Sequence, residues 1–394
     1  MKTNLSLIVS VLACSLPNPG RVAFCQDWIW TTNRPGGDLA SIVSSADGNK
    51  LVETAFLGGV FSSTNGGQTW IWYSNGVTGF SPPITSSADG KKLAAANHTT
   101  GGAIYTSTNG GSTWASNFVF GSSGWASIAS SSDGNQLVAA PNGAGTIFIS
   151  TNAGLTWKSN NLSSVQAWGC VASSADGSKL VAGTYQNVYT STNSGDNWMS
   201  YYTPNLGWRT LASSADGMKL VAGVNFGNFG SVYTSTNGGA TWASNSVPVS
   251  SAKYQVVSSA DGKSLIASGT HGTYSSANGG ATWTSNYVEF NTGFHSVASS
   301  ADGNKLVAVG SAGFIYTSET MSTPLLGIKL SASNVVISWL IPSQPFTLQQ
   351  NPDLTTTNWS DVPTPPVLNL TNLHHEVTMP LSSSSIFYRL KVNP

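Results

Sequence analysis

An Asp-Gly pair recurs through most of the chain and constrains the fold more than any other feature. Consecutive copies are 40 to 45 residues apart, and their aspartates are Asp47, Asp89, Asp133, Asp176, Asp216, Asp261 and Asp302. A second motif, of the form S-x-N-x-G-x-T-W, occurs six times and ends at Trp70, Trp114, Trp157, Trp198, Trp242 and Trp283. Repetition at this period is typical of propellers and solenoids, so we expect seven similar units.

One period divides into four short strands. Turn-forming pairs separate runs of apolar and β-branched residues, and these runs cover residues 125–131, 136–140, 146–151 and the stretch that begins at Trp157. Four strands in 40 to 45 residues make the sheet of a propeller blade, whose two apolar faces must be covered by neighbouring blades. The pattern therefore predicts an all-β chain with a seven-bladed β-propeller.

The two ends of the array indicate how the ring closes. Trp28 precedes Asp47 by 19 residues, the distance at which motif tryptophans precede the next turn. Residues 28–31 are thus predicted to be a fourth strand without the first three. Residues 314–318 form a third strand, after which the motif decays. We expect the N-terminal strand to complete the last blade, because this pairing leaves no exposed sheet edge.

The S-x-N-x-G-x-T-W hairpins resemble Asp-box (BNR) repeats with Asn in place of Asp. Such repeats occur in sialidases, xyloglucanases, sortilin-type receptors and exported propellers that assist photosystem II assembly. The resemblance covers about residues 26–320 and implies a propeller in which Ser and Asn bond the turn while Trp packs between sheets. It implies no particular activity. WD-type propellers share the period, but the Trp-Asp dipeptide is absent.

The repeat stops near Thr323, and residues 324–394 have a different pattern. Alternating strands are predicted at residues 327–330, 335–340, 346–349 and 386–392, which fits a small β-sandwich of immunoglobulin or fibronectin type. The phrases Phe-Thr-Leu-Gln-Gln and Phe-Tyr-Arg-Leu resemble C-terminal modules that follow repeats in exported bacterial proteins. The resemblance implies a role in attachment or presentation. A packing domain without a binding role is the alternative.

The first 25 residues are predicted to be a signal peptide. Lys2 precedes an apolar run from Leu5 to Ala13, and cleavage would follow Cys25. Lipidation at Cys14 is the alternative. The mature protein is therefore expected to be secreted or held at the cell surface, and the rest of the sequence contains no apolar run long enough to span a membrane. Cys170 then has no partner for a disulfide.

Charge and histidine spacing restrict the partners. Charged residues make up 8% of the chain and cancel to a net charge of zero, so no basic surface is expected for nucleic acid. We expect an extracellular glycan or protein partner and favour a monomer. No cofactor is expected, because no metal-ligand spacing emerges and the Gly-Gly pairs precede no helix.

Catalysis would need side chains that the repeats scarcely provide. A sialidase clamps its substrate carboxylate with three arginines, but residues 26–320 contain only Arg34 and Arg209, so a functional sialidase is not expected. Another glycoside hydrolase or a lyase needs two carboxylates. Asp38 and Glu289 lie in loops that lead into the first and seventh blades, which ring closure makes neighbours. They form the candidate catalytic pair, and solvated loop acids are the alternative interpretation.

The best candidate binding surface is the start of each first strand, on what we call the upper rim. The position eight residues before the turn aspartate is aromatic in four of seven repeats, and in three repeats a polar or aromatic residue follows it. Such rings stack on sugars or grip peptides, and the alternative interpretation is that they wedge between blades, as the motif tryptophans do. The candidate ligand-binding residues are Trp125, Trp168, Trp208, Arg209, Tyr254, Phe294 and His295.

These patterns favour an exported, non-catalytic binding propeller that recognises a carbohydrate or a protein at its upper rim. The alternatives are the glycoside hydrolase or lyase with Asp38 and Glu289 and a purely structural surface protein.

Overall fold

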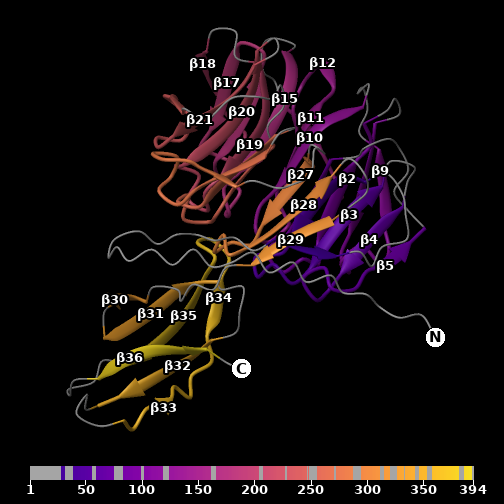
Figure 1. The fold of residues 1–394 in the computed structure, drawn as a ribbon. Coiled ribbons are helices and arrows are strands. Elements are labelled where there is room, and N and C mark those ends of the chain that lie inside the picture. The colour runs from indigo at the N-terminus through magenta and orange to yellow at the C-terminus, as the bar shows by residue number, and fades with distance from the viewer. Residues whose placement is uncertain are drawn as a thin grey trace.

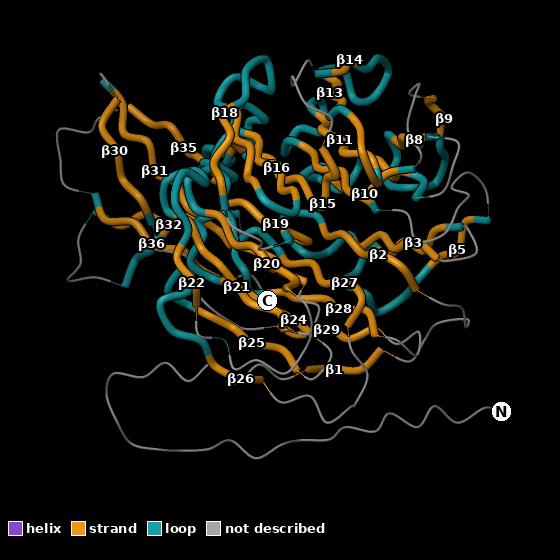
Figure 2. Tube along the Cα trace, turned by 90° about the horizontal axis from the view of Figure 1, so that it is seen from above, coloured by secondary structure: helices purple, strands orange, loops and turns teal. Residues whose placement is uncertain are grey.

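The computed structural model contains strands and loops, and no helix occurs in the part it describes (Figure 2). It describes residues 28–31, 39–55, 59–74, 83–98, 102–118, 124–160, 166–203, 207–226, 229–245, 247, 255–269, 272–286, 294–310, 315–319, 326–331, 333–341, 346–352, 357–380 and 386–392. Within these ranges, no helix is long and apolar enough to cross a membrane.

In the described residues, the repeats form seven antiparallel sheets, which we number as blades in chain order. Blades 1 and 2 contain β2 (Leu39–Ser44), β3 (Leu51–Ala55), β4 (Val60–Ser63) and β5 (Ile71–Tyr73), then β6 (Ile84–Ser86), β7 (Leu93–Ala96), β8 (Ala103–Ser107) and β9 (Ala115–Phe118). Blades 3 and 4 contain β10 (Trp125–Ser130), β11 (Leu137–Pro141), β13 (Phe148–Ser150) and β14 (Lys158–Ser159), then β12 (Gly143–Gly145), β15 (Gln166–Ser173), β16 (Leu180–Thr184), β17 (Asn187–Ser191) and β18 (Met199–Tyr202).

The remaining blades follow the same order. Blades 5 and 6 contain β19 (Trp208–Ser213), β20 (Leu220–Phe226), β21 (Phe229–Ser235) and β22 (Ala243–Asn245), then β23 (Gln255–Ser258), β24 (Leu265–Gly269), β25 (Gly272–Ser276) and β26 (Thr284–Asn286). Blade 7 contains β27 (Phe294–Ser299), β28 (Lys305–Gly310), β29 (Ile315–Glu319) and β1 (Trp28–Thr31). This arrangement is a β-propeller, as the repeat predicts (Figure 1).

A closed circuit of backbone hydrogen bonds joins the blades at the end of their first strands. Each N–H donates to the carbonyl of the equivalent residue in the next blade at 2.7–2.8 Å. The last blade donates back to the first. The circuit runs through Ala46, Ala88, Ser132, Ala175, Ala215, Ala260 and Ala301. First strands of neighbouring blades also contact each other around the whole ring, including β2 with β27.

The predicted closure by the N-terminal strand is confirmed. β1 pairs antiparallel with β29, and Trp28 lies opposite Ser318 while Thr31 lies opposite Ile315. The last blade therefore obtains its fourth strand from the start of the chain. This pairing covers the edge of β29, which would otherwise offer unpaired backbone groups to another chain.

The Asp-Gly turns lie on the lower face, at the opposite end of the ring from the upper rim. In the third blade, Asp133 Oδ1 accepts hydrogen bonds from Ser131 Oγ at 2.6 Å and from the Asn135 N–H at 2.9 Å. Gly134 has a φ of 71°, a left-handed conformation that disfavours side chains. Lys92 of the preceding blade donates to the Asp133 carbonyl at 3.0 Å. Each such turn thus stabilises its own hairpin, and several also anchor a lysine from the neighbouring blade.

These turns predict acid sensitivity. Burial would raise the carboxyl pKa values of Asp89, Asp133, Asp176 and Asp216, but hydrogen bonds and nearby lysines outweigh it and lower them below 3.8. A lowered pKa contributes stability that is present above the unfolded-state pKa and is lost as pH falls through the folded-state pKa. We expect the urea midpoint of the wild type to decrease as the pH falls below about 4. The decrease should be smaller in Asp133→Asn. Urea unfolding curves recorded between about pH 6 and 2 measure both. Equal slopes in both proteins would contradict this assignment.

The six S-x-N-x-G-x-T-W hairpins adopt one hydrogen-bond pattern. In the second blade, Ser107 Oγ donates to Asn109 Oδ1 and accepts from the Gly111 N–H, both at 3.0 Å. The Trp114 indole N–H donates to the Gly111 carbonyl at 2.9 Å. The structural role predicted for Ser, Asn and Trp in these hairpins is therefore confirmed.

The C-terminal residues form a separate pair of sheets, the C-terminal sandwich (Figure 1). One sheet has the order β30 (Gly327–Ser331), β31 (Asn334–Leu340), β35 (His374–Pro380) and β34 (Val367–Asn369). The other has the order β33 (Ser360–Asp361), β32 (Phe346–Asn351) and β36 (Phe387–Val392). Their shared core contains Ile337, Trp339, Leu348 and Val377. The predicted sandwich is confirmed, although β33, β34 and β35 were not predicted.

The sandwich packs onto the lower face of the propeller, at the alanines of the hydrogen-bond circuit. Ile341 is buried against Ala46, Ala260 and Ala301. Ser132 takes the place of alanine in this circuit, and its Oγ donates to the Ala175 carbonyl at 2.8 Å and to the Leu370 carbonyl of the sandwich. The sandwich thus covers this end of the ring axis, and the upper rim lies at the other end.

Candidate functional site

The three rim tryptophans are packing residues. Trp125, Trp168 and Trp208 are 0%, 4% and 1% exposed, and each belongs to a core cluster between neighbouring blades. Their rings meet aromatic rings of the third strand edge-on, at centroid separations of 5.2–5.9 Å. A ligand at the rim cannot stack on them in this conformation. Their burial therefore supports the alternative interpretation, that these rings pack between neighbouring blades.

The packing around Trp208 shows why the neighbouring positions are small. A Cβ at Gly183 would lie 2.5 Å from the Trp208 Cβ, and one at Gly169 would lie 2.0 Å from the Trp208 carbonyl oxygen. The Trp208 indole N–H donates to Thr203 Oγ1 at 2.8 Å. The site of this ring is therefore complete, with its apolar surface covered and its polar atom bonded.

Other predicted rim residues differ in exposure. Phe294 is buried against Tyr316, at a centroid separation of 5.1 Å. Arg209 and His295 are exposed. Tyr254, Asp38 and Glu289 lie outside the described residues, so the catalytic pair stays a prediction.

A β-bulge explains why Arg209 and His295 face solvent while their neighbours do not. The strand register shifts between Trp208 and Thr210 and again between Phe294 and Ser296. A bulge places two residues opposite one on the partner strand and re-aims a side chain. Arg209 and His295 are the extra residues of these bulges, in blades 5 and 7. Blade 6 lies between these two blades, and we call this side of the upper rim the arc of blades 5 to 7.

The bulge positions on the other side of the rim carry small residues. The register shift recurs after Leu39, Trp125 and Trp168, and the extra residues there are Ala40, Ala126 and Gly169. The described bulges of blades 5 and 7 thus differ in chemistry from those of blades 1, 3 and 4. Within the described residues, the ion pairs involve Lys158, Lys263 and Lys305, and Arg209 belongs to none of them.

Two further rim residues were missed by sequence reasoning. Tyr185 is exposed in the turn between β16 and β17, and its carbonyl accepts the Gly207 N–H at 3.0 Å, next to Trp208 and Arg209. An aromatic residue in a two-residue turn on the predicted upper rim was the available signal. Tyr185 thus adds an exposed aromatic ring to the rim of blade 4, which adjoins blade 5.

His98 is the other missed residue, between β7 and β8. Its Nδ1 lies 2.9 Å from the Trp125 carbonyl oxygen, and its Nε2 lies 3.3 Å from Asn142 Nδ2. Because a carbonyl only accepts, Nδ1 carries the proton and Nε2 accepts from the amide. His98 therefore links the loops of blades 2 and 3 through these two hydrogen bonds. No described group of three or more His, Cys, Asp and Glu side chains could hold a metal ion.

The described carboxylates of the propeller lie away from the upper rim. Most belong to the lower turns, Asp196 lies in a lower hairpin and Glu319 pairs with Lys305 at 3.7 Å. Glu53 is buried in β3, where the other six blades carry alanine. Burial also raises the pKa of the Cys170 thiol to about 12, which leaves it protonated and unreactive near neutral pH.

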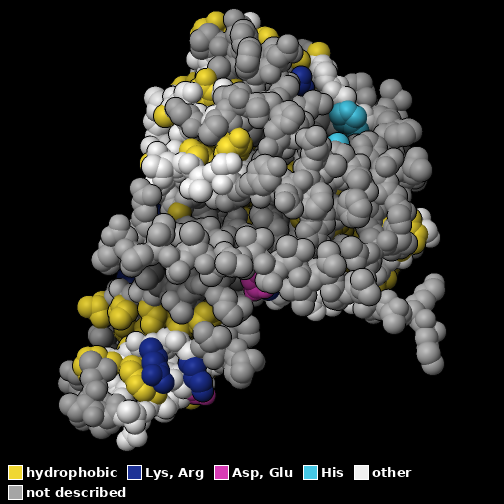
Figure 3. Space-filling model, viewed as in Figure 1, with side chains coloured by type: hydrophobic (Ala, Val, Ile, Leu, Met, Phe, Trp, Pro, Cys, Tyr) yellow, Lys and Arg dark blue, Asp and Glu magenta, His cyan; other side chains and the backbone are white. Residues whose placement is uncertain are grey.

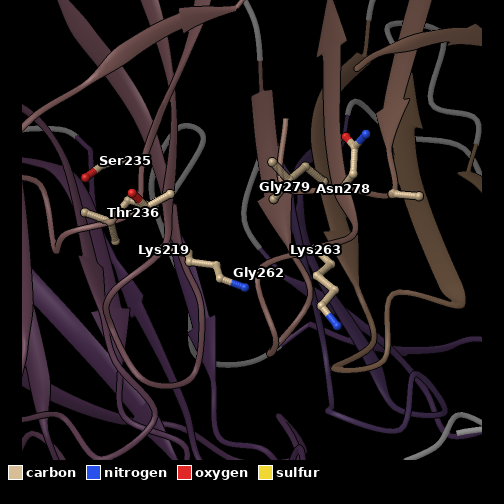
Figure 4. Close-up of a pocket in the computed structure, with 10 residues that line it drawn as sticks. Lys219, Ser235, Thr236, Gly262, Lys263, Asn278 and Gly279 are labelled. Carbon is tan, nitrogen blue, oxygen red and sulfur yellow. The ribbon is translucent and has the colours of Figure 1, made fainter. Parts of the chain in front are cut away.

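Two cavities lie at equivalent places between neighbouring blades. One of about 400 Å³ lies between blades 5 and 6, and one of about 380 Å³ lies between blades 7 and 1. In the first, Lys219 points toward the turn at Gly262, and its Nζ donates to the Asp261 carbonyl at 2.8 Å (Figure 4). Lys305 contributes a similar contact to Asn49 in the second. These cavities contain the lysines that join neighbouring blades and provide no distinct chemistry.

Comparisons with known proteins support the fold alone. No family model and no curated protein matches the chain. The solved structure "YCF48 bound to D1 peptide" is similar at 14% identity and a TM-score of 0.55, over 75% of this chain and 97% of that one. YCF48 from Cyanidioschyzon merolae is similar at 15% and 0.56, over 74% and 98%. The GH74 xyloglucanase from Xanthomonas campestris is similar at 15% and 0.59, over 80% of this chain and 59% of the enzyme. All three comparisons place this chain among β-propellers.

Proposed function

We propose that the protein is an exported binding propeller that recognises a protein partner at the arc of blades 5 to 7. The observation that carries this proposal is the exposed Arg209 in a bulge of the upper rim, two residues after Gly207, whose N–H donates to the carbonyl of the exposed Tyr185. A guanidinium group forms paired hydrogen bonds with carboxylates, and an adjacent ring adds apolar contact area. An acidic peptide segment, or a free C-terminal carboxylate, fits this pair.

Two further observations support this proposal. The C-terminal sandwich covers the lower face, so the upper rim is the end of the axis that it leaves accessible. A structure with a similar fold is described as bound to a peptide. The export signal expected from residues 1–25 would place the partner outside the cytoplasm.

Peptide and glycan arrays test the proposal. We expect peptides with acidic residues to bind, and Arg209→Ala to weaken them at least about tenfold, as expected when a charged hydrogen bond is lost. His295→Ala should weaken them less. Lys158→Ala is the matched control, because Lys158 is exposed on the far outer strand of blade 3. Binding to glycans alone, or peptide binding that survives Arg209→Ala, would contradict the proposal.

A further inference from the structure

In the part of the chain that the structure describes, the second sheet of the C-terminal sandwich has an open edge. Among the described strands, β36 pairs with β32 alone, and β30 pairs with β31 alone. The first sheet has four strands and the second has three, so the second sheet is one strand narrower. A strand edge without a partner presents alternate N–H and C=O groups that can pair with an extended chain.

The inner face of β30 is the part left uncovered. Ile328 lies directly opposite Ile337, and Leu330 lies directly opposite Val335, so both side chains share the face that forms the core. Ile337 is 0% exposed, yet Ile328 is 64% and Leu330 is 67% exposed. Two large aliphatic side chains on the inner face of a sandwich are exposed here because no described strand of the other sheet lies over them.

Basic side chains flank this strip. Lys329 alternates with the two aliphatic residues on the outer face of β30, and Arg389 and Lys391 lie on the outer face of β36. All three are exposed. Arg389 is already held by Gln349 Oε1 at 2.8 and 3.0 Å and stacks on Trp359, which leaves Lys391 as the available cation. Apolar and basic side chains lie side by side over the region of β30, β31 and β36 (Figure 3).

We propose that the edge of β36 accepts an extended segment of another protein, in which apolar side chains alternate with acidic ones. The segment pairs its backbone with β36, places its apolar residues over Ile328 and Leu330, and places its acidic residues beside Lys391. Cross-strand neighbours of opposite charge stabilise a sheet. A second copy of this edge is a poor occupant, because pairing β36 with its own copy would bring Arg389 and Lys391 of one chain beside those of the other.

Synthetic peptides test this directly on the full chain. The probe is a peptide in which valine alternates with aspartate, and the comparison is a peptide in which valine alternates with lysine. We expect the aspartate peptide to bind at least tenfold more tightly and to slow amide exchange in residues 387–392. Ile328→Thr with Leu330→Thr should weaken it at least tenfold. Val367→Thr is the matched control, because Val367 is equally exposed but lies on β34 at the opposite edge.

A charge swap and a tethered peptide complete the test. Lys391→Glu should reverse the preference between the two peptides. Each peptide is also appended after Pro394 through a flexible linker, which raises its effective concentration. We expect the appended aspartate strand alone to protect residues 387–392. Unchanged exchange in both the free and the tethered experiments, or binding that is insensitive to the Ile328 and Leu330 substitutions, would overturn the proposal. None of these outcomes depends on Arg209.

Discussion

Trp208→Ala is expected to lower the free energy of unfolding by about 3–5 kcal/mol. Trp208 is almost fully buried between blades 4 and 5, where it contacts Trp242 at a centroid separation of 4.6 Å. Its removal leaves a large cavity and leaves the Thr203 hydroxyl without its donor. Urea unfolding followed by circular dichroism measures the change.

Arg209→Ala is the matched control one residue further along β19. Its side chain is exposed, so we expect its unfolding free energy to stay within about 0.5 kcal/mol of the wild type. The two substitutions therefore separate stability from binding. If Trp208→Ala unfolded at the wild-type urea concentration while it lost ligand binding, Trp208 would contact the ligand and the packing assignment would be wrong.

The ring was predictable because each blade repeats the same local chemistry. The turn at Asp133 and the hairpin at Trp114 are stabilised by short-range hydrogen bonds that recur wherever the motif recurs. The closing strand was predictable because Trp28 keeps the spacing of the repeat. By contrast, β12 was not predicted, since its three residues are two glycines and an alanine without a strand pattern. Its pairing with β15 depends on a neighbouring blade.

The candidate site was harder to predict, because the insertion of one extra residue in a strand decides which of two neighbouring side chains is exposed. The spacing from the turn aspartate placed both Trp208 and Arg209 at the upper rim. It could not show that a bulge leaves the first buried and the second exposed. A bulge depends on how two strands pair, and the sequence of one strand does not contain that information. The docking of the sandwich was equally hidden. The sequence signal for this contact is Ser132, which replaces an alanine of the repeat. Its role is visible only in the structure, where its hydroxyl donates to the Leu370 carbonyl.

Removal of residues 1–31 is expected to weaken the closure of the ring. β1 supplies the fourth strand of blade 7, so its loss exposes the edge of β29 and removes the chain connection from the last blade to the first, while the contacts of β2 with β27 remain. We expect the thermal midpoint to fall on the order of 10 °C, at about 2–4 °C per kcal/mol lost. The exposed edge should also promote aggregation, which light scattering during the melt detects.

A peptide with the sequence of residues 26–35 should reverse both effects in trans. Binding of the peptide to the truncated chain stabilises the folded state in proportion to the logarithm of its concentration, so the midpoint should rise with added peptide. The same peptide with Ile29→Pro should fail, because proline removes a backbone donor from a strand and restricts its conformation. An unchanged midpoint after truncation, or equal rescue by the proline peptide, would show that β1 does not close the ring. Rescue by the native peptide alone would mean that the chain specifies a ring of blades in which the last strand is interchangeable with a separate segment of the same sequence.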